Sequence, residues 1–104
     1  MPKNLPSKEE ILTKLKQLKP IYLKEGIEII GLFGSYAKDE QRTFSDIDIA
    51  YKLHHEILSK NYHNGFAKLL RIESIKEELK NTFKKNIDFV ANKNTKIFKG
   101  LIRV

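Results

Sequence analysis

The sequence contains no cysteine and no apolar segment long enough to cross a bilayer. Without cysteine, the chain has no disulfide, no thiolate zinc or iron–sulfur site and no cysteine nucleophile. A membrane helix needs roughly 18 consecutive apolar residues, and no run approaches that length. The first four residues also lack the apolar core of a signal peptide. These absences are compatible with a cytoplasmic protein that makes no membrane contact.

The composition indicates a folded chain with a basic surface. Hydrophobic residues make up 40% and charged residues 32% of the 104 residues, which favours one small core over disorder. We therefore expect residues 1–104 to form a single domain. The net charge of +7 attracts nucleotides, nucleic acids and acidic proteins without choosing among them. A solvated, lysine-rich surface would have the same charge.

The hydrophobic pattern predicts alternating helices and strands. Ser7 and Glu10 have the spacing of a capping box, which predicts a helix that begins after Ser7 and reaches Gly26. Strands are expected at 27–33, 46–52 and 86–90, and helices at 35–40 and 66–83. This order predicts an α/β (α+β) fold, with a small mixed sheet flanked by helices. The pattern leaves residues 54–65 and 95–104 unassigned, with a turn expected at 92–94.

The helix expected at 66–83 carries most of its apolar residues on one face, and we expect this face to pack into the core. These residues are Phe66, Leu69, Leu70, Ile72, Ile75, Leu79 and Phe83. From Lys80 to Val104 the chain is mostly basic. This segment would suit RNA or an acidic partner, although a solvated basic face is the simpler interpretation because few aromatic residues interleave with the charges.

Two aspartates, Asp46 and Asp48, lie two positions apart in an expected strand. Side chains at this spacing project from the same face of a strand, so the two carboxylates would lie together. A cation between them would relieve their repulsion, and Mg²⁺ prefers oxygen ligands. Asp88 has a similar place in the third strand and would complete a three-carboxylate cluster if the strands pair. Alternatively, each aspartate is a solvated residue at a turn or strand edge.

Gly34 and Ser35 follow the first strand and open the short helix. A glycine lets the backbone approach a phosphate closely, and the first N–H groups of a helix can donate to an anion. The segment is not a Walker A motif because the Gly-Lys-Ser/Thr ending is missing. An ordinary helix N-cap would use the same residues.

Three histidines are expected to lie on the surface. His54, His55 and His63 do not have the spacing of a metal site, and no cysteine is present to assist them.

Taken together, the motifs resemble the minimal nucleotidyltransferases of the DNA polymerase β superfamily. The resemblance rests on Gly34-Ser35-Tyr36-Ala37-Lys38, Ser45-Asp46-Ile47-Asp48 and Asp88, in that order. It extends from about Leu15 to Val90, and the segment 32–38 looks especially like the MNT antitoxins of HEPN/MNT toxin–antitoxin pairs. The resemblance implies a polymerase β-like nucleotidyltransferase fold.

The resemblance also implies a role for each matching residue. Gly34 and Ser35 would bind the triphosphate of the incoming nucleotide, and Lys38 would contact a phosphate. Two Mg²⁺ ions would be held by Asp46, Asp48 and Asp88. The third of these carboxylates would also help to deprotonate an acceptor hydroxyl, which attacks the α-phosphorus and releases pyrophosphate.

The resemblance further implies a substrate and a partner. The chain would move AMP from ATP to a tyrosine of a HEPN ribonuclease toxin, encoded by an adjacent gene, and so act as its antitoxin. Two other functions stay open: a non-catalytic antitoxin that acts by occlusion, and a basic nucleic-acid-binding domain. Asp39 stands where the family usually has glycine, and we expect its carboxylate to face solvent.

Overall fold

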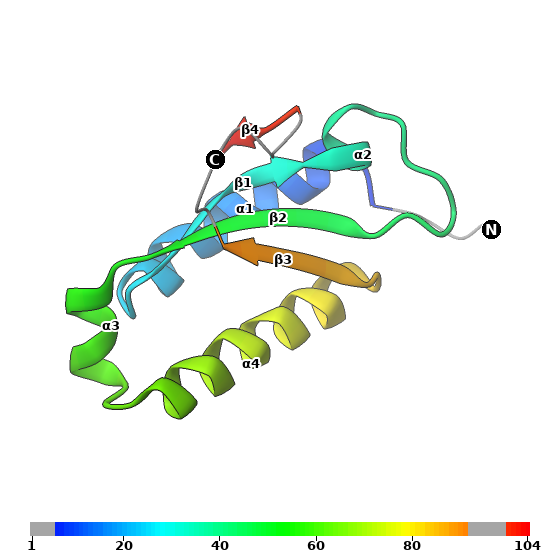
Figure 1. The fold of residues 1–104 in the computed structure, drawn as a ribbon. Helices are drawn as coiled ribbons and strands as arrows, with labels where there is room; N and C mark the ends of the chain where they lie inside the picture. The colour runs from blue at the N-terminus through cyan, green and yellow to red at the C-terminus, as the bar shows by residue number, and fades with distance from the viewer. Residues whose placement is uncertain (1–5, 92–99) are drawn as a thin grey trace.

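A computed structural model describes residues 6–91 and 100–104, which form a four-stranded sheet with helices packed against it (Figure 1). The elements follow in the order α1 (Lys8–Leu23), β1 (Ile27–Phe33), α2 (Gly34–Ala37), β2 (Ile47–Leu53), α3 (His55–Asn61), α4 (Gly65–Phe83), β3 (Ile87–Ala91) and β4 (Ile102–Arg103). The strands expected at 27–33, 46–52 and 86–90 are confirmed to within one residue.

The sheet is mixed, with the strand order β3-β2-β1-β4. β1 runs antiparallel to both β2 and β4, whereas β2 and β3 are parallel. The approach of β4 to β1 requires a glycine at position 31, because a Cβ there would lie 2.0 Å from the carbonyl oxygen of Ile102. This mixed sheet with flanking helices confirms the fold class predicted from the sequence.

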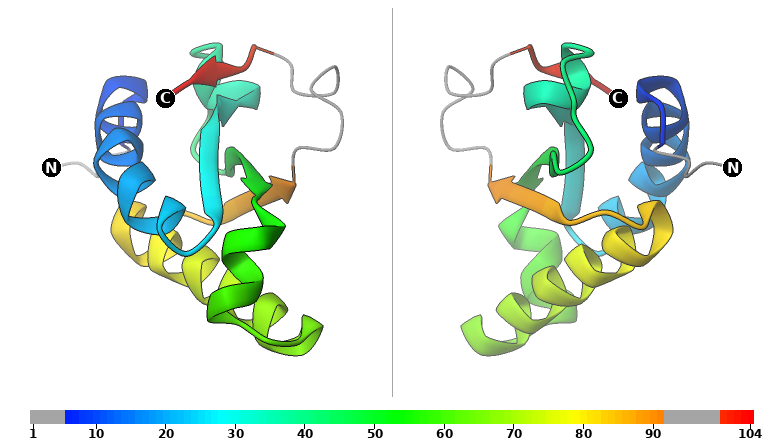
Figure 2. Two further views of the ribbon diagram at one scale, coloured as in Figure 1. Left: turned by 90° about the vertical axis from the view of Figure 1, so that its left-hand side faces the viewer. Right: turned by 90° about the vertical axis from the view of Figure 1, so that its right-hand side faces the viewer.

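The main core lies between one face of the sheet and the helices α1 and α4, which both lie on that side (Figure 2). The sheet contributes fully buried isoleucines from its alternating positions, among them Ile29, Ile47 and Ile49. The opposite face holds a smaller cluster around Ile30 and Ala50. Because side chains alternate along a strand, polar residues placed between the isoleucines of β2 project away from α1 and α4.

Helix α1 begins with the predicted capping box. The Glu10 N–H donates to Ser7 Oγ at 3.1 Å, and the Ser7 N–H donates to Glu10 Oε1 at 2.8 Å. The helix continues through Pro20 and ends at Leu23. Gly26 therefore lies in the turn that follows and is not the C-cap, which is Lys24.

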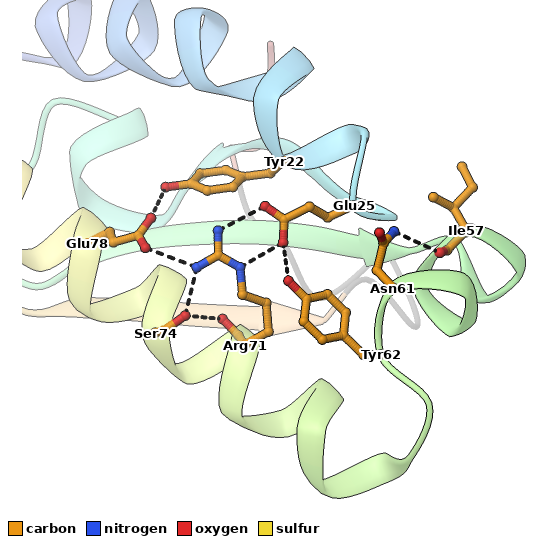
Figure 3. A network of polar contacts seen from close by, with 8 residues as sticks. All are labelled: Tyr22, Glu25, Ile57, Asn61, Tyr62, Arg71, Ser74 and Glu78. Atoms are coloured by element: carbon orange, nitrogen blue, oxygen red, sulfur yellow. Dashed lines mark hydrogen bonds and ion pairs between the residues drawn. The ribbon is translucent and has the colours of Figure 1, made fainter.

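A network centred on Arg71 joins α4 to the turn between α1 and β1 (Figure 3). The guanidinium binds both carboxylate oxygens of Glu25, at 2.7 and 2.9 Å, and one oxygen of Glu78 at 3.0 Å. The hydroxyl groups of Tyr22 and Tyr62 donate to these two carboxylates. The hydrogen bonds from Arg71 hold the pKa of Glu25 below its usual value. Figure 3 also draws a separate contact within α3.

Only some of the apolar residues of α4 pack into the core. Ile75, Leu79 and Phe83, from its C-terminal half, are buried. The expectation that the remaining apolar residues also pack there is wrong for Phe66, Leu69 and Leu70, which are 71%, 54% and 53% exposed. The reason is geometric: at about 100° of rotation per residue, Phe66 and Leu70 lie on the side of the helix opposite Ile75, whose side packs against the sheet.

The segments that the hydrophobic pattern left unassigned contain α3 and β4. The turn expected at 92–94 and the basic residues between β3 and Gly100 lie outside the described residues. None of the described helices combines the length and the apolar character needed to cross a membrane.

Candidate active site

Asp48 lies near the start of the central strand β2 and faces Asp88 of β3 in register. From the sequence, a three-carboxylate cluster is expected only if the strands of Asp48 and Asp88 pair, and they do. Asp48 is half-buried, whereas Asp46 and Asp88 are exposed. Ile47 and Ile87, paired in the preceding register position, are buried in the main core. The alternation therefore directs the Asp48 and Asp88 carboxylates to the face of the sheet opposite α1 and α4.

The electrostatic environment of Asp48 is unfavourable for its charge. Burial raises the pKa of its carboxyl group from 3.8 to about 6, and the negative charges of Asp88 and Asp46 add to the rise, as does hydrogen bonding with Asp88. No described cation is among the causes of this shift. Burial and the neighbouring negative charges therefore raise the free energy of the ionised Asp48 side chain, and a bound cation would lower it.

Gly34 brings the main chain against the Asp48 carboxylate. The antiparallel pairing of β1 with β2 places Phe33 opposite Asp48, and Gly34 follows with a φ of +76°. A Cβ at position 34 would lie 2.0 Å from Asp48 Oδ2. Both the left-handed backbone and this close approach require glycine, because the Asp48 carboxylate already occupies the place that a Cβ would take.

Ser35 and Lys38 belong to the short helix α2 and the turn that ends it. The Ser35 carbonyl accepts hydrogen bonds from the N–H groups of Lys38, at 3.2 Å, and Glu40, at 2.8 Å. The Lys38 ammonium lies on the surface, 3.7 Å from a Glu40 carboxylate oxygen. Asp39 adopts a φ of +57°, and its carboxylate binds Lys8 at 2.9 Å. Its expected orientation toward solvent is confirmed.

The positive φ of Asp39 gives a physical reason for the glycine that the family resemblance led us to expect at this position. A positive φ disfavours residues with a Cβ, although aspartate and asparagine tolerate the left-handed region better than most. The turn is thus compatible with aspartate at this position, and the exposed carboxylate forms its ion pair with Lys8 of α1.

A cleft of about 470 Å³ opens beside Asp46. It is lined by Thr43, Phe44, Asp46, Lys80, Asn81, Lys84, Lys85 and Asn86. Its lysines belong to the basic segment from Lys80 to Val104, for which the sequence suggested RNA or an acidic partner, but apart from Asp46 none of the lining residues was singled out as a site residue. Their signals were weak, since a single aromatic residue in a polar loop and two lysines one helical turn apart are common surface features.

The donor set suits a hard divalent cation. Asp46, Asp48 and Asp88 offer only oxygen ligands, which Mg²⁺ prefers, and a cation would offset the repulsion that raises the Asp48 pKa. Across residues 6–91 and 100–104, however, no three acidic or histidine side chains converge closely enough to hold one ion in the arrangement shown. Binding would therefore require rotation of side chains, which the exposure of Asp46 and Asp88 permits.

The histidines lie apart from these carboxylates. His54 precedes α3, at the far end of β2, and its Nε2 lies 2.7 Å from a Glu28 carboxylate oxygen. His55 and His63 are exposed. The expectation of surface histidines is confirmed for His55 and His63, while His54 is partly covered.

Comparison with known proteins identifies the class to which this fold and these residues belong. The model of the family described as "Polymerase beta, Nucleotidyltransferase" matches residues 16–102. The chain belongs to this family and is a nucleotidyltransferase. It is similar to the putative protein adenylyltransferase MJ0435 of Methanocaldococcus jannaschii, with 35% identity over 73% of this chain and 71% of the relative. No solved structure matches the chain significantly.

Proposed function

We propose that this chain is a Mg²⁺-dependent adenylyltransferase that moves AMP from ATP to a hydroxyl group of a protein. The observation that carries the proposal is the contact between Gly34 and Asp48, which joins a helix-opening glycine to a half-buried carboxylate paired with Asp88. The similarity to a relative named as a putative protein adenylyltransferase supports both the nucleotide and the class of acceptor.

Each residue of the site has a role in this proposal. The N–H groups at the start of α2 and the Ser35 hydroxyl bind the triphosphate, because a glycine there lets phosphate approach the main chain. Lys38 lies at the end of the same short helix, and a change of its side-chain rotamer would let its ammonium group contact a phosphate. The divalent cations are held by Asp46, Asp48 and Asp88. When bound, Mg²⁺ supplies charge stabilisation to the attacking and leaving oxygens.

The transfer exchanges one phosphate bond for another. The acceptor oxygen forms a bond to the α-phosphorus, the bond between the α-phosphorus and its bridging oxygen to the β-phosphate breaks, and pyrophosphate leaves. Asp88 accepts the proton of the hydroxyl group, which its exposure at the open edge strand β3 allows. Residues of the chain thus position both reactants and receive the proton.

We propose further that the acceptor is a tyrosine of a HEPN ribonuclease toxin and that the transfer makes the chain an antitoxin. This step rests on the likeness of segment 32–38 to MNT antitoxins. Residues 1–104 would act as one domain in the cytoplasm, where ATP and Mg²⁺ are present.

Occlusion of a partner is a second candidate function, and a specific observation favours it. Phe66, Leu69 and Leu70 expose large apolar side chains on one stretch of α4. Scattered apolar residues are ordinary on a surface, but a group of them on one helix is typical of a contact with another protein. A partner bound there would be neutralised without nucleotide transfer.

Label transfer tests the two functions. The wild-type protein is incubated in extract of the source cells with Mg²⁺ and ATP labelled at the α-phosphate, beside the Asp46→Asn/Asp48→Asn double variant. Asp39→Asn, a single change of the same kind outside the carboxylate cluster, is the control. A labelled protein band with wild type and control, absent with the double variant, supports transfer. A toxin that is bound and inhibited equally by all three proteins, without label, would establish occlusion instead.

A further inference from the structure

The cleft beside Asp46 has a cationic wall. Lys80, Lys84 and Lys85 line it, together with polar side chains and Phe44. The Lys85 ammonium donates to the Thr43 carbonyl at 2.6 Å, so this lysine fixes the loop that forms the opposite wall. Within the described part of the chain, Lys80 and Lys84 form no ion pair. Because these three lysines face a single carboxylate in the lining, that of Asp46, the cleft has a positive balance of charge that attracts an anionic ligand.

The cleft also offers an apolar contact. The side chain of Phe44 is 94% exposed, the largest exposed fraction among the large hydrophobic residues described. A ligand that covers an exposed aromatic ring removes apolar surface from water, which favours binding. The site therefore combines charge attraction with one apolar anchor, a combination typical of ligand-binding clefts.

The position of the cleft assigns it to one side of the carboxylate cluster. Within the sheet, β2 lies between β1 and β3. Gly34, where the triphosphate is proposed to bind, follows β1 and contacts Asp48. The cleft instead includes Asn86, which precedes β3, and the end of α4. It thus lies on the side of β2 away from Gly34, while Asp46 is shared by the cleft and the cluster.

We propose that this cleft binds an acidic segment of the acceptor polypeptide and so presents the acceptor hydroxyl to the carboxylate cluster. The inference rests on the proposed adenylyl transfer to a protein and adds the chemistry by which the acceptor is chosen. Acidic side chains of the acceptor pair with Lys80 and Lys84, and an apolar side chain covers Phe44. The acceptor hydroxyl then lies toward Asp46, opposite the nucleotide.

A polypeptide fits the cleft better than a nucleic acid does. Proteins that bind single-stranded nucleic acid stack successive bases on several aromatic side chains along a positively charged groove. Among the described residues, Phe44 is the single aromatic side chain that lines this cleft. The volume of about 470 Å³ suits a few side chains of a bound segment.

Direct binding of peptides tests the inference without any chemical step. The probes are two fluorescein-labelled decapeptides, each with one tyrosine, which is flanked by glutamates in one and by glutamines in the other. Their affinities for the full chain, with Mg²⁺ and a non-hydrolysable ATP analogue present, are measured by fluorescence anisotropy. We expect the glutamate peptide to bind about tenfold more tightly at low salt, and the preference to decline as ionic strength rises.

Matched variants locate the binding site. Lys80→Gln/Lys84→Asn removes both free charges, and asparagine is chosen because Lys84 has a φ of +57°, which asparagine tolerates. Lys16→Gln/Lys60→Gln removes the same charge from exposed positions on α1 and α3. The cleft variant should lose the preference for the glutamate peptide, and the control variant should retain it. Phe44→Ala should weaken the binding of both peptides.

The possible outcomes separate this inference from the proposed function. Equal affinity for the two peptides, or a preference that survives in Lys80→Gln/Lys84→Asn, would overturn the inference even if label transfer succeeds. Tighter, lysine-dependent binding of a single-stranded oligonucleotide than of the glutamate peptide would also overturn it, in favour of a nucleic acid ligand. Failure of label transfer with an intact peptide preference would overturn the transfer reaction alone and leave a binding site for acidic peptides.

Discussion

Replacing Asp48 with asparagine should stabilise the metal-free protein at neutral pH. A carboxyl group whose pKa is raised on folding stabilises the fold when protonated and loses that contribution as pH rises. For Asp48 the pKa rises from 3.8 to about 6, so the loss takes place between about pH 4 and pH 6. Asparagine resembles the protonated side chain in shape and carries no charge at any of these pH values.

The size of the effect follows from the pKa. A rise from 3.8 to about 6 corresponds to about 3 kcal/mol, since each pKa unit is worth about 1.4 kcal/mol. Because Asp48 is only half-buried, solvent screening reduces this value, and we expect a gain of about 1 to 1.5 kcal/mol for Asp48→Asn above pH 7. The gain should vanish near pH 4, where the wild-type carboxyl is protonated in the folded protein.

Urea unfolding followed by circular dichroism, in EDTA at pH 4 and pH 8, measures the gain. Asp88→Asn tests its cause, because removing that charge should lower the pKa of Asp48 and recover part of the stability. Titration of the Asp48 carboxyl by NMR in wild type and Asp88→Asn reports the same shift directly. An equal stability difference at both pH values, or a less stable Asp48→Asn protein at pH 8, would refute the electrostatic reasoning.

Addition of Mg²⁺ should reverse the order of stability. A ligand that binds only the folded state raises the free energy of unfolding in proportion to the logarithm of its concentration above Kd. Wild type should therefore gain stability with added Mg²⁺ at pH 8, whereas Asp48→Asn should gain little. A stabilisation by Mg²⁺ that is the same in both proteins would show that the ion binds elsewhere.

Three further substitutions test other parts of the structure. Gly34→Ala should cost about 1 to 2 kcal/mol in urea unfolding because of its positive φ, and should abolish label transfer because the new methyl group displaces the Asp48 carboxylate. Arg71→Ala should cost about 2 to 4 kcal/mol, since it leaves the half-buried Glu25 without its cationic partner; a loss below about 0.5 kcal/mol would contradict this. Tyr36→Phe should raise the thermal unfolding midpoint, with a gain of about 1 kcal/mol, because the buried Tyr36 hydroxyl has no partner within the described residues.

Much of the secondary structure could be predicted because its causes are local. The capping box of Ser7 and Glu10 needs only the first turn of a helix. The β-branched run of β1 and the alternation in β2 need only the period of a strand. The pairing of β4 with β1, by contrast, brings Ile102 to Gly31 across most of the chain, and no local pattern carries that information.

The candidate site also combines local relations that the sequence determines with contacts that only the tertiary structure decides. By itself, the sequence determined that Gly34 and Ser35 follow a strand and that Asp46 and Asp48 share one side of another, because these relations depend on neighbouring residues. The register of Asp48 with Asp88, the contact of Gly34 with Asp48 and the cleft beside Asp46 depend on which strands and helix ends meet.

The apolar residues of α4 also separate what the sequence determines from what the tertiary structure decides. The 3.6-residue period places Phe66 and Leu70 on the side of the helix opposite Ile75 and Leu79, because helical geometry alone fixes that relation. Only the tertiary structure decided that the first two are exposed and the last two are buried. The physical reason is that burial depends on the place where the helix meets the sheet, which no property of the helix itself specifies.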